Sequence, residues 1–255
     1  MNLVTDKNRK QYVDEGYCVI KNALSKEYIQ DMLDSCNKSI DEIHEYMDEN
    51  NTDVMGITHR NKRYFISNKY LHPGHEKLHG VLFSDVMAHV TSSLLGNSVF
   101  LFNEQFVVKT SKTGTSFQWH QDSGYVGHSN HKPYLTCWIP LVDVSEENGT
   151  AFILPYDKAG TKEYVHHTLE EGTNDMVGYF GEEKGIPAVV STGDIVCFSS
   201  TTFHRSGANN TNQWRPVYVA QYSPEVIMSA EGDKPWNQAI PFVKNGKNIK
   251  NLATA

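Results

Sequence analysis

The sequence predicts a mainly β fold, a jelly roll or barrel whose helices pack on one outer face. Two observations carry this prediction. Amphipathic helical patterns dominate the chain up to about residue 97, whereas short runs of β-branched and aromatic residues, separated by turn signals, dominate from residue 98 to about 223. Many short strands after a helical region are typical of a sandwich or barrel that carries its helices on one side.

The length of 255 residues favours a single domain, because one-domain β sandwiches and barrels often reach this size. We expect this domain to comprise a helical N-terminal part over about residues 1–97, a jelly-roll core over about 98–223 and a C-terminal extension over about 224–255. The sequence shows no internal repeat, low-complexity tract or linker that would divide it further.

Composition and charge narrow the classes of function. The formal net charge of −7 argues against binding to nucleic acid or to an anionic membrane surface by bulk electrostatics. No apolar run approaches the length of a membrane span, and the first residues lack the apolar stretch of a secretory signal. The cysteines are widely spaced in apolar settings that suit reduced thiols, so we expect a cytoplasmic protein.

Helices are expected over residues 6–15, from residue 26 onward and from residue 85 to 95. Gly16 closes the first, and residues 17–20 are typical of a short strand. Ser25 and Ser84 are suitable N-caps for the other two. Apolar residues recur at helical spacing after Ser25, so we expect that face to pack against the protein's own sheet. Residues 50–72 are polar and look irregular.

Strands are expected at residues 99–102, 106–108, 117–120, 134–141, 151–154, 195–198 and 215–222. Because strand side chains alternate, Asn103, Gln105, Val107 and Lys109 share one face, and Thr136 shares a face with Trp138 two residues on. On geometry alone, Gln105 and Thr136 are candidate contacts for a cosubstrate.

His120 and Asp122 carry the strongest chemical signal. Residues two apart in an extended chain point to the same face, so both side chains at a strand end can bind one metal from one side. A third ligand must come from elsewhere, and His204 is the best candidate. Two His and one carboxylate with open positions is the ligand set of non-haem Fe(II) oxygenases.

These residues stand in a pattern that resembles the phytanoyl-CoA dioxygenase family. The resemblance runs from about Tyr12 to Tyr222 and rests on five groups of residues: His120-Gln121-Asp122, Cys137-Trp138-Ile139-Pro140-Leu141, Asn148-Gly149, Gly193-Asp194, and His204-x-Ser206 with Arg215. It implies an Fe(II)- and 2-oxoglutarate-dependent oxygenase on a double-stranded β-helix.

The resemblance also implies roles for single residues. His120, Asp122 and His204 would be the iron ligands, Ser206 and Arg215 would contact 2-oxoglutarate, and Trp138 would lie beside it. Arg215 suits the distal carboxylate, because guanidinium pairs with carboxylate through two hydrogen bonds. The loop over residues 207–212 joins the strands of His204 and Arg215, which we expect to be neighbours offering ligand and counter-ion along one side.

The implied reaction consumes O2 and 2-oxoglutarate, releases succinate and CO2, and hydroxylates or desaturates an unactivated C–H bond of a small molecule. Desaturation and ring closure begin with the same hydrogen abstraction, so the pattern does not separate them, nor does it name the substrate or the oligomeric state. The alternative is a non-redox, cupin-like metal-binding isomerase or ligand-binding module, which would have no need for Arg215 or Ser206.

Two stretches are candidates for substrate contact. Residues 123–132 follow the ligand strand directly and suit a rim or lid over the iron, where Tyr125, His128 and His131 are candidate contacts. The basic side chains between residues 60 and 69 suit a local site for a phosphonate, carboxylate or coenzyme A group. That candidate anion site consists of Arg60, Arg63 and Lys69.

Overall fold

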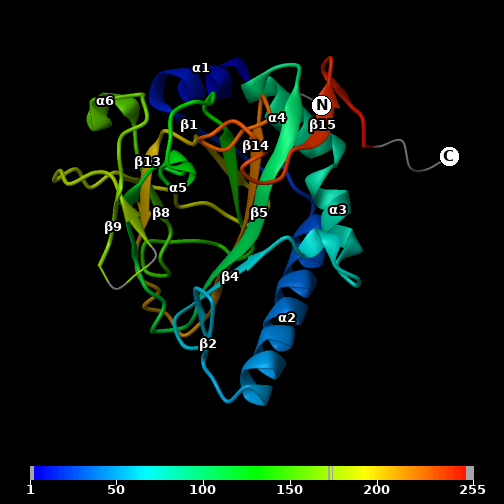
Figure 1. Cartoon of the computed structure of the whole chain (residues 1–255), viewed down its shortest axis with the longest axis vertical. Helices are drawn as coiled ribbons and strands as arrows, with labels where there is room; N and C mark the ends of the chain where they lie inside the picture. The colour runs from blue at the N-terminus through cyan, green and yellow to red at the C-terminus, as the bar shows by residue number, and fades with distance from the viewer. Residues whose placement is uncertain (1–2, 172, 174, 251–255) are drawn as a thin grey trace.

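Two antiparallel sheets face each other (Figure 1). The motif residues line a cavity between these sheets. The computed structural model describes residues 3–171, 173 and 175–250. Within these residues the large sheet has the strand order β1-β12-β7-β14-β5-β4-β3-β2, with β15 and β16 attached through β5, and the small sheet has the order β11-β8-β13-β6. This arrangement confirms the jelly-roll prediction.

The strands of the large sheet are β1 (Tyr17–Ile20), β2 (Val54–Met55), β3 (Thr58–His59), β4 (Arg63–Ser67), β5 (Val99–Lys109), β7 (Leu135–Pro140), β12 (Ile195–Ser199), β14 (Arg215–Ser223), β15 (Ile240–Lys244) and β16 (Lys247–Asn248). Those of the small sheet are β6 (Phe117–His120), β8 (Ala151–Leu154), β11 (Ile186–Pro187) and β13 (Phe203–Ser206). A separate hairpin-like pair comprises β9 (Thr168–Leu169) and β10 (Met176–Val177).

Helices cover the outer face of the large sheet. They are α1 (Asp6–Glu15), α2 (Lys26–Glu49), α3 (Glu76–Leu82) and α4 (Asp85–Leu95), with the 3₁₀ turn η1 (Lys69–Leu71) and the short helices α5 (Ser123–Val126) and α6 (Tyr156–Ala159) elsewhere. Ser25 caps α2 by accepting the Tyr28 amide at 3.2 Å. The apolar face of α2 packs into one core with the outward residues of the sheet, as its spacing predicts (Figure 1).

The alternation along β14 shows how the sheet separates core from site. All nine of its residues are buried. Tyr218 and Ala220 point into the core beneath the helices. Val217 and Val219 point the other way, towards the small sheet. Arg215 lies at an odd-numbered position of the same strand, so its side chain enters the space between the sheets.

The large sheet takes strands from both ends of the chain. β1 pairs with β12, β4 pairs with β5 over residues 63–67, and β15 pairs with the start of β5. Residues 50–72, whose polar sequence looks irregular, therefore supply sheet strands, because pairing with β5 outweighs local composition. The division into N-terminal, core and C-terminal parts stays a prediction.

No helix within the described ranges is long and apolar enough to cross a membrane. Cys18, Cys36, Cys137 and Cys197 are all buried free thiols, as expected.

Candidate active site

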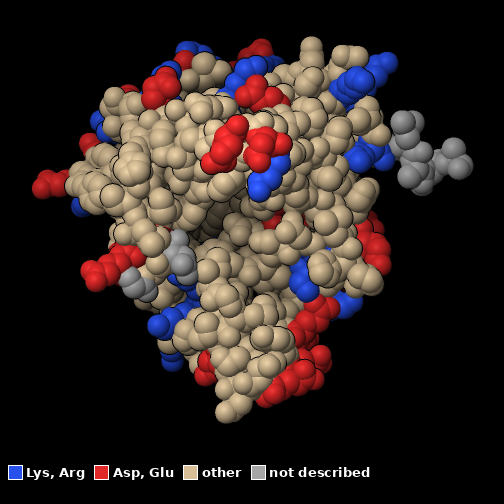
Figure 2. Space-filling view, in the orientation of Figure 1, with Lys and Arg blue, Asp and Glu red and all other residues tan. Residues whose placement is uncertain are grey.

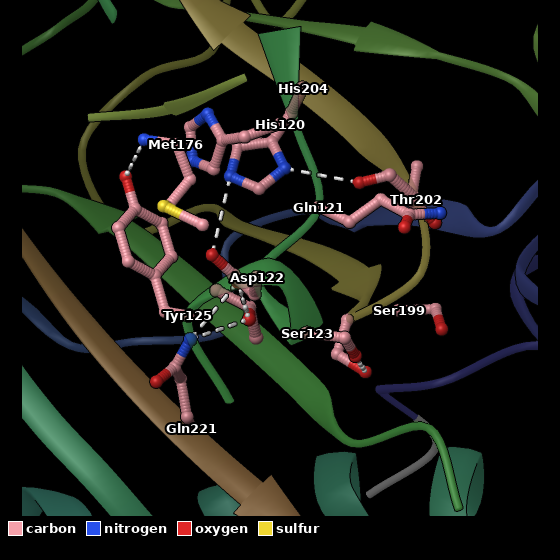
Figure 3. Close-up of polar contacts among 12 residues, drawn as sticks. His120, Gln121, Asp122, Ser123, Tyr125, Met176, Ser199, Thr202, His204 and Gln221 are labelled. Carbon is pink, nitrogen blue, oxygen red and sulfur yellow. Dashed lines mark hydrogen bonds and ion pairs between the residues drawn. The ribbon is translucent and has the colours of Figure 1, made fainter. Parts of the chain in front are cut away.

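The three predicted metal ligands converge between the sheets (Figure 3). His120 on β6 and His204 on β13 are cross-strand partners, with ring centroids 4.2 Å apart. Asp122 lies just beyond the end of β6, as the N-cap of α5, and its Oδ1 is 3.5 Å from His204 Nε2. One ligand atom from each residue lies within 4.8 Å of the other two. This spacing allows one ion to contact all three.

Backbone carbonyls fix the orientation of both imidazole rings. His120 Nδ1 lies 2.7 Å from the Gln118 carbonyl oxygen, and His204 Nδ1 lies 3.1 Å from that of Thr202. Each Nδ1 therefore carries the proton and donates it, so each Nε2 is left with a lone pair for a metal. Burial, reinforced by the nearby His204, lowers the pKa of His120 to about 3, which keeps the ring neutral. The ring chemistry thus fits a metal site.

The carboxylate of Asp122 is oriented by hydrogen bonds to one of its oxygens. Its Oδ2 accepts from the Thr136 hydroxyl and, at 3.0 Å, from Gln221 Nε2 (Figure 3). Burial alone would raise the pKa of Asp122, but His204, His120 and the Thr136 hydrogen bond together lower it to about 2. The charged Oδ1 remains directed towards the two His rings, as an iron ligand requires.

Gln121 lies between the two ligands in the sequence, and its hydrogen bonds hold the turn that carries them. Its side chain points away from the metal position, donates to the carbonyls of Glu163 and Thr201 at 2.9 and 2.7 Å, and accepts the Val165 amide at 2.9 Å. Its own backbone amide donates to His167 at 2.8 Å. The middle residue of the motif therefore fixes the loop over residues 163–167 against the ligand turn.

A pair of buried cations lies on the large sheet beside the metal position. Arg215 is 1% exposed, and its Nε and Nη1 atoms have no hydrogen-bond partner among the described residues. Its cross-strand partner on β5 is Lys109, which is fully buried. Burial lowers the pKa of Arg215 to about 9, and burial with the charge of Arg215 lowers the pKa of Lys109. The unsatisfied donors on the buried Arg215 fit the distal carboxylate of 2-oxoglutarate.

Lys109 was not among the predicted cosubstrate contacts, although the sequence held a signal for it. It shares a strand face with Gln105, and that alternation is observed in β5. Its Nζ donates to Ser206 Oγ at 2.7 Å and to the Gly207 carbonyl. Ser206, predicted to contact the cosubstrate, therefore lies beside this lysine on the opposite sheet.

The other predicted cosubstrate residues all line the same cavity. Trp138 lies with its ring centroid 5.8 Å from Arg215 Cζ. Gln105 accepts from Ser67 at 3.5 Å. The Thr136 hydroxyl donates to Asp122, so the contact observed for Thr136 is with a metal ligand. Cosubstrate contact by Trp138, Gln105 and Thr136 stays a prediction.

The cavity has a volume of about 300 Å³ and reaches from the metal ligands to the surface. Of the predicted rim residues, Tyr125 lines it, with its ring 5.5 Å from that of His120. Among the described lining residues, His128 and His131 are absent. Sequence reasoning missed several further lining residues, among them the polar or aromatic residues Asp175, Gln221, Trp236 and Asn237.

The fold and the site together define a class of enzyme. A jelly roll with two His and one carboxylate between its sheets, next to a buried arginine with free donors, is built for an Fe(II)- and 2-oxoglutarate-dependent oxygenase. The chain belongs to the phytanoyl-CoA dioxygenase (PhyH) family, whose model matches residues 12–217. It is thus an Fe(II)/2-oxoglutarate-dependent dioxygenase, which favours the redox interpretation over a non-redox barrel.

Curated proteins are similar to this chain at low sequence identity. The chain is 24% identical to phytanoyl-CoA dioxygenase domain-containing protein 1 of Danio rerio, over 95% of this chain and 98% of that protein. It is 25% identical to a probable alpha-ketoglutarate-dependent hypophosphite dioxygenase of Stutzerimonas stutzeri, over 84% of this chain and 77% of that protein.

Solved structures share the fold. The non-haem alpha-ketoglutarate-dependent carbocyclase SnoK of nogalamycin biosynthesis aligns with a TM-score of 0.66 at 18% identity, covering 94% of this chain and 93% of that one. EctD from S. alaskensis, solved with 2-oxoglutarate and 5-hydroxyectoine, aligns with a TM-score of 0.67 at 17% identity, covering 94% and 85%. At these identities the likeness supports the fold alone.

Proposed function

We propose that this dioxygenase hydroxylates, or desaturates, an unactivated C–H bond of a small molecule, in the reaction that converts 2-oxoglutarate and O2 into succinate and CO2. The observation that supports this most is the cavity of about 300 Å³, which has His120, Asp122 and His204 in its wall together with Arg215. A substrate in this space would lie directly against the metal position. Hydroxylation places one O2 atom in succinate and the other in the product.

The three ligands would hold Fe(II), and their neutral rings and single carboxylate leave coordination positions for a bidentate 2-oxo acid and O2. Arg215 would bind the distal carboxylate of 2-oxoglutarate through its guanidinium, whose Nε and Nη1 atoms have no partner among the described residues. Ser206, with the Lys109 that donates to it, would lie at the same end of the cosubstrate. The iron, when bound with 2-oxoglutarate, supplies the activation of O2 that attack on a C–H bond needs.

The walls of the cavity exclude water and position the substrate. Phe198 and Val219 line the cavity near the ligands, with Trp138, and their apolar surfaces exclude water from the reacting groups. Tyr125, on the turn that follows the ligand motif, contacts the His120 ring and forms part of the substrate side. Positioning the target carbon against the metal is the protein's main contribution to rate and selectivity.

Two measurements test this function. Anaerobic addition of 2-oxoglutarate to the Fe(II) protein should produce a visible metal-to-ligand charge-transfer band. In air, succinate formation should require Fe(II), 2-oxoglutarate and O2, and a compound library should contain members that stimulate it. Absence of both the band and calorimetric binding of 2-oxoglutarate to the Fe(II) protein would refute the proposal. The product's mass then separates the two outcomes, because hydroxylation adds an oxygen atom and desaturation removes two hydrogens.

A further inference from the structure

Arg63 and Asp175 both line the cavity, and they neutralise each other's charge by forming an ion pair. Arg63 Nη1 lies 2.7 Å from Asp175 Oδ2, and their side chains are only 13% and 9% exposed. The Arg63 guanidinium also lies against the rings of Phe65 and Phe117, at 5.3 and 5.1 Å from their centroids. This cation is therefore held by a carboxylate and two rings, and a ligand anion would have to compete with Asp175 for it.

The other basic side chains of the predicted anion site are also paired and lie outside the cavity wall. Arg60 forms ion pairs with Asp48 and Asp53, and Lys69 with Glu42. Among the lining residues that the structure describes, Arg60 and Lys69 are absent. The three cations that would suit a phosphonate or coenzyme A group thus form no common site.

Arg205 is a further basic residue among those that line the cavity. Its guanidinium, however, contacts groups outside the cavity wall. It alternates with His204 and Ser206 along β13, so its side chain leaves the opposite face of the strand. Its guanidinium lies 4.0 Å from the ring centroid of Phe152 and donates to the Lys184 carbonyl at 3.2 Å. Lys109 is buried behind the wall and is not one of the lining residues described.

Uncharged polar groups form one side of the cavity instead. Asn237 donates to Asn103 at 3.3 Å, Asn103 donates to Gln221 at 3.0 Å, and Gln221 donates to Asp122 at 3.0 Å. Gln105 adds a fourth carboxamide to the same wall. A carboxamide both donates and accepts hydrogen bonds, which suits hydroxyl and amide groups of a ligand.

Aromatic rings also line the cavity. These lining residues are Phe65, Phe102, Phe117, Tyr125 and Trp236. Figure 2 shows the molecule hollowed near the middle of the face drawn, with much of the surrounding surface tan and a group of acidic and basic side chains just above the hollow. A flat or cyclic apolar skeleton would bury its surface against such rings.

We infer that the substrate carries no negative charge where it meets the protein and offers hydroxyl or amide groups on an apolar, cyclic skeleton. This inference rests on the proposed function and names the substrate class for its site. An anionic substrate would either displace Asp175 from Arg63 or be buried without a partner, and both cost free energy. An uncharged substrate needs neither, because the carboxamides supply its hydrogen bonds.

A matched pair of probes tests the inference. Phenylmethanesulfonamide and phenylmethanesulfonate have nearly the same shape, but only the sulfonate is charged at neutral pH. Each probe would be titrated anaerobically into the protein loaded with Fe(II) and saturating 2-oxoglutarate. The 2-oxoglutarate occupies the part of the cavity next to Arg215, so the probes cannot bind there. The wild-type protein should bind the sulfonamide more tightly than the sulfonate. Tighter binding of the sulfonate would overturn the inference.

Removing the carboxylate that pairs with Arg63 should reverse the preference for the sulfonamide over the sulfonate. In Asp175→Asn the guanidinium loses its carboxylate partner, and the affinity for the sulfonate should rise about tenfold or more, as expected for a hydrogen bond between charged groups. The double variant Arg63→Gln/Asp175→Asn should lose that gain, and Asp53→Asn, which removes a carboxylate from an exposed ion pair, should not show it. Thermal unfolding of each variant verifies that it is folded.

The outcomes separate the substrate class from the function. A folded Asp175→Asn protein that gains no sulfonate affinity would show that Arg63 does not control the charge of the cavity, and the inference would fall. A charge-transfer band that forms before the titration shows that iron and 2-oxoglutarate bind as the proposed function requires, whatever the probes do. Absence of both the band and calorimetric binding of 2-oxoglutarate would instead overturn the proposed function itself.

Discussion

Lys109 and Arg215 are cross-strand partners on β5 and β14, so two buried cations lie side by side on the large sheet, and Arg215 lines the cavity that also holds the metal ligands. The charge of Arg215 lowers the pKa of Lys109, and burial lowers the pKa of both. Adjacent desolvated cations are stabilised by a shared anion. We therefore expect the distal carboxylate of 2-oxoglutarate to be that anion.

Arg215→Ala should raise the KM for 2-oxoglutarate strongly and leave Fe(II) binding largely intact. Truncating one side of a buried charge pair costs roughly 2–5 kcal/mol, because the other charge stays buried without its partner. Calorimetric titration of 2-oxoglutarate, with Fe(II) affinity measured separately, tests this expectation. Cosubstrate affinity equal to that of the wild type would show that the carboxylate binds elsewhere.

Lys109→Met should weaken 2-oxoglutarate binding less than Arg215→Ala, because Lys109 acts partly through Ser206. The carboxylate should raise the lowered pKa of Lys109, so binding takes up a proton where the free lysine is neutral. The Kd for 2-oxoglutarate should then increase as pH rises in the wild type and change less in Lys109→Met. Parallel pH profiles for the two proteins would assign Lys109 a purely structural role.

Gln221→Leu should weaken Fe(II) binding, since Gln221 donates to Asp122 Oδ2 and to the Thr136 hydroxyl that also orients this carboxylate. Loss of such a supporting hydrogen bond typically costs about 10–100-fold in metal affinity. Anaerobic Fe(II) titration measures the effect. Asn237→Ala, at the far end of the carboxamide row, is the matched control and should change Fe(II) affinity much less.

The ligand set and the positions of several strands along the chain were predictable because each rests on local signals. The alternation of polar and apolar residues located β5, β6, β7 and β14, and the His-x-Asp pattern located the metal site. The relation between His204 and Arg215 was predicted wrongly. Their strands follow each other in sequence but lie in opposite sheets, so ligand and counter-ion approach from two sides of the cavity.

Other parts of the site depend on pairing over long sequence distances. Tyr222 pairs with Leu101 but Gln221 pairs with Asn103, so Phe102 is an extra residue in β5. This irregularity lets both Phe102 and Asn103 line the cavity, whereas simple alternation would allow only one of them. The pairing of Arg63 with Asp175, 112 residues apart, likewise has no local signal.

Glu104 should make the stability of the protein depend on pH. It lies on β5 with its Oε2 accepting from the Tyr218 hydroxyl at 2.6 Å, and burial raises its pKa from 4.5 to about 7. As pH rises from about 4.5 to about 7, the unfolded chain releases this proton before the folded protein does. The free energy of unfolding should therefore fall, by roughly 3 kcal/mol in total.

Glu104→Gln removes this ionisation and should flatten that part of the pH dependence. Denaturant unfolding of both proteins at several pH values between 4 and 8 measures it. The two curves should diverge as pH increases, with the variant becoming relatively more stable. A slope in Glu104→Gln as steep as that of the wild type would place the responsible group elsewhere.

Asp122→Ala should weaken Fe(II) binding and abolish turnover, because it removes a charged ligand whose Oδ1 faces both His rings. His120→Ala and His204→Ala should have the same effect, and a double variant should be no worse than a single one, since the ligands act as a unit. Asp122 would also take up a coordination position of the bound iron, so the unmodified protein should give no chlorinated product in chloride buffer. Near-normal succinate formation by Asp122→Ala, or chlorination by the wild type, would overturn its assignment as a ligand.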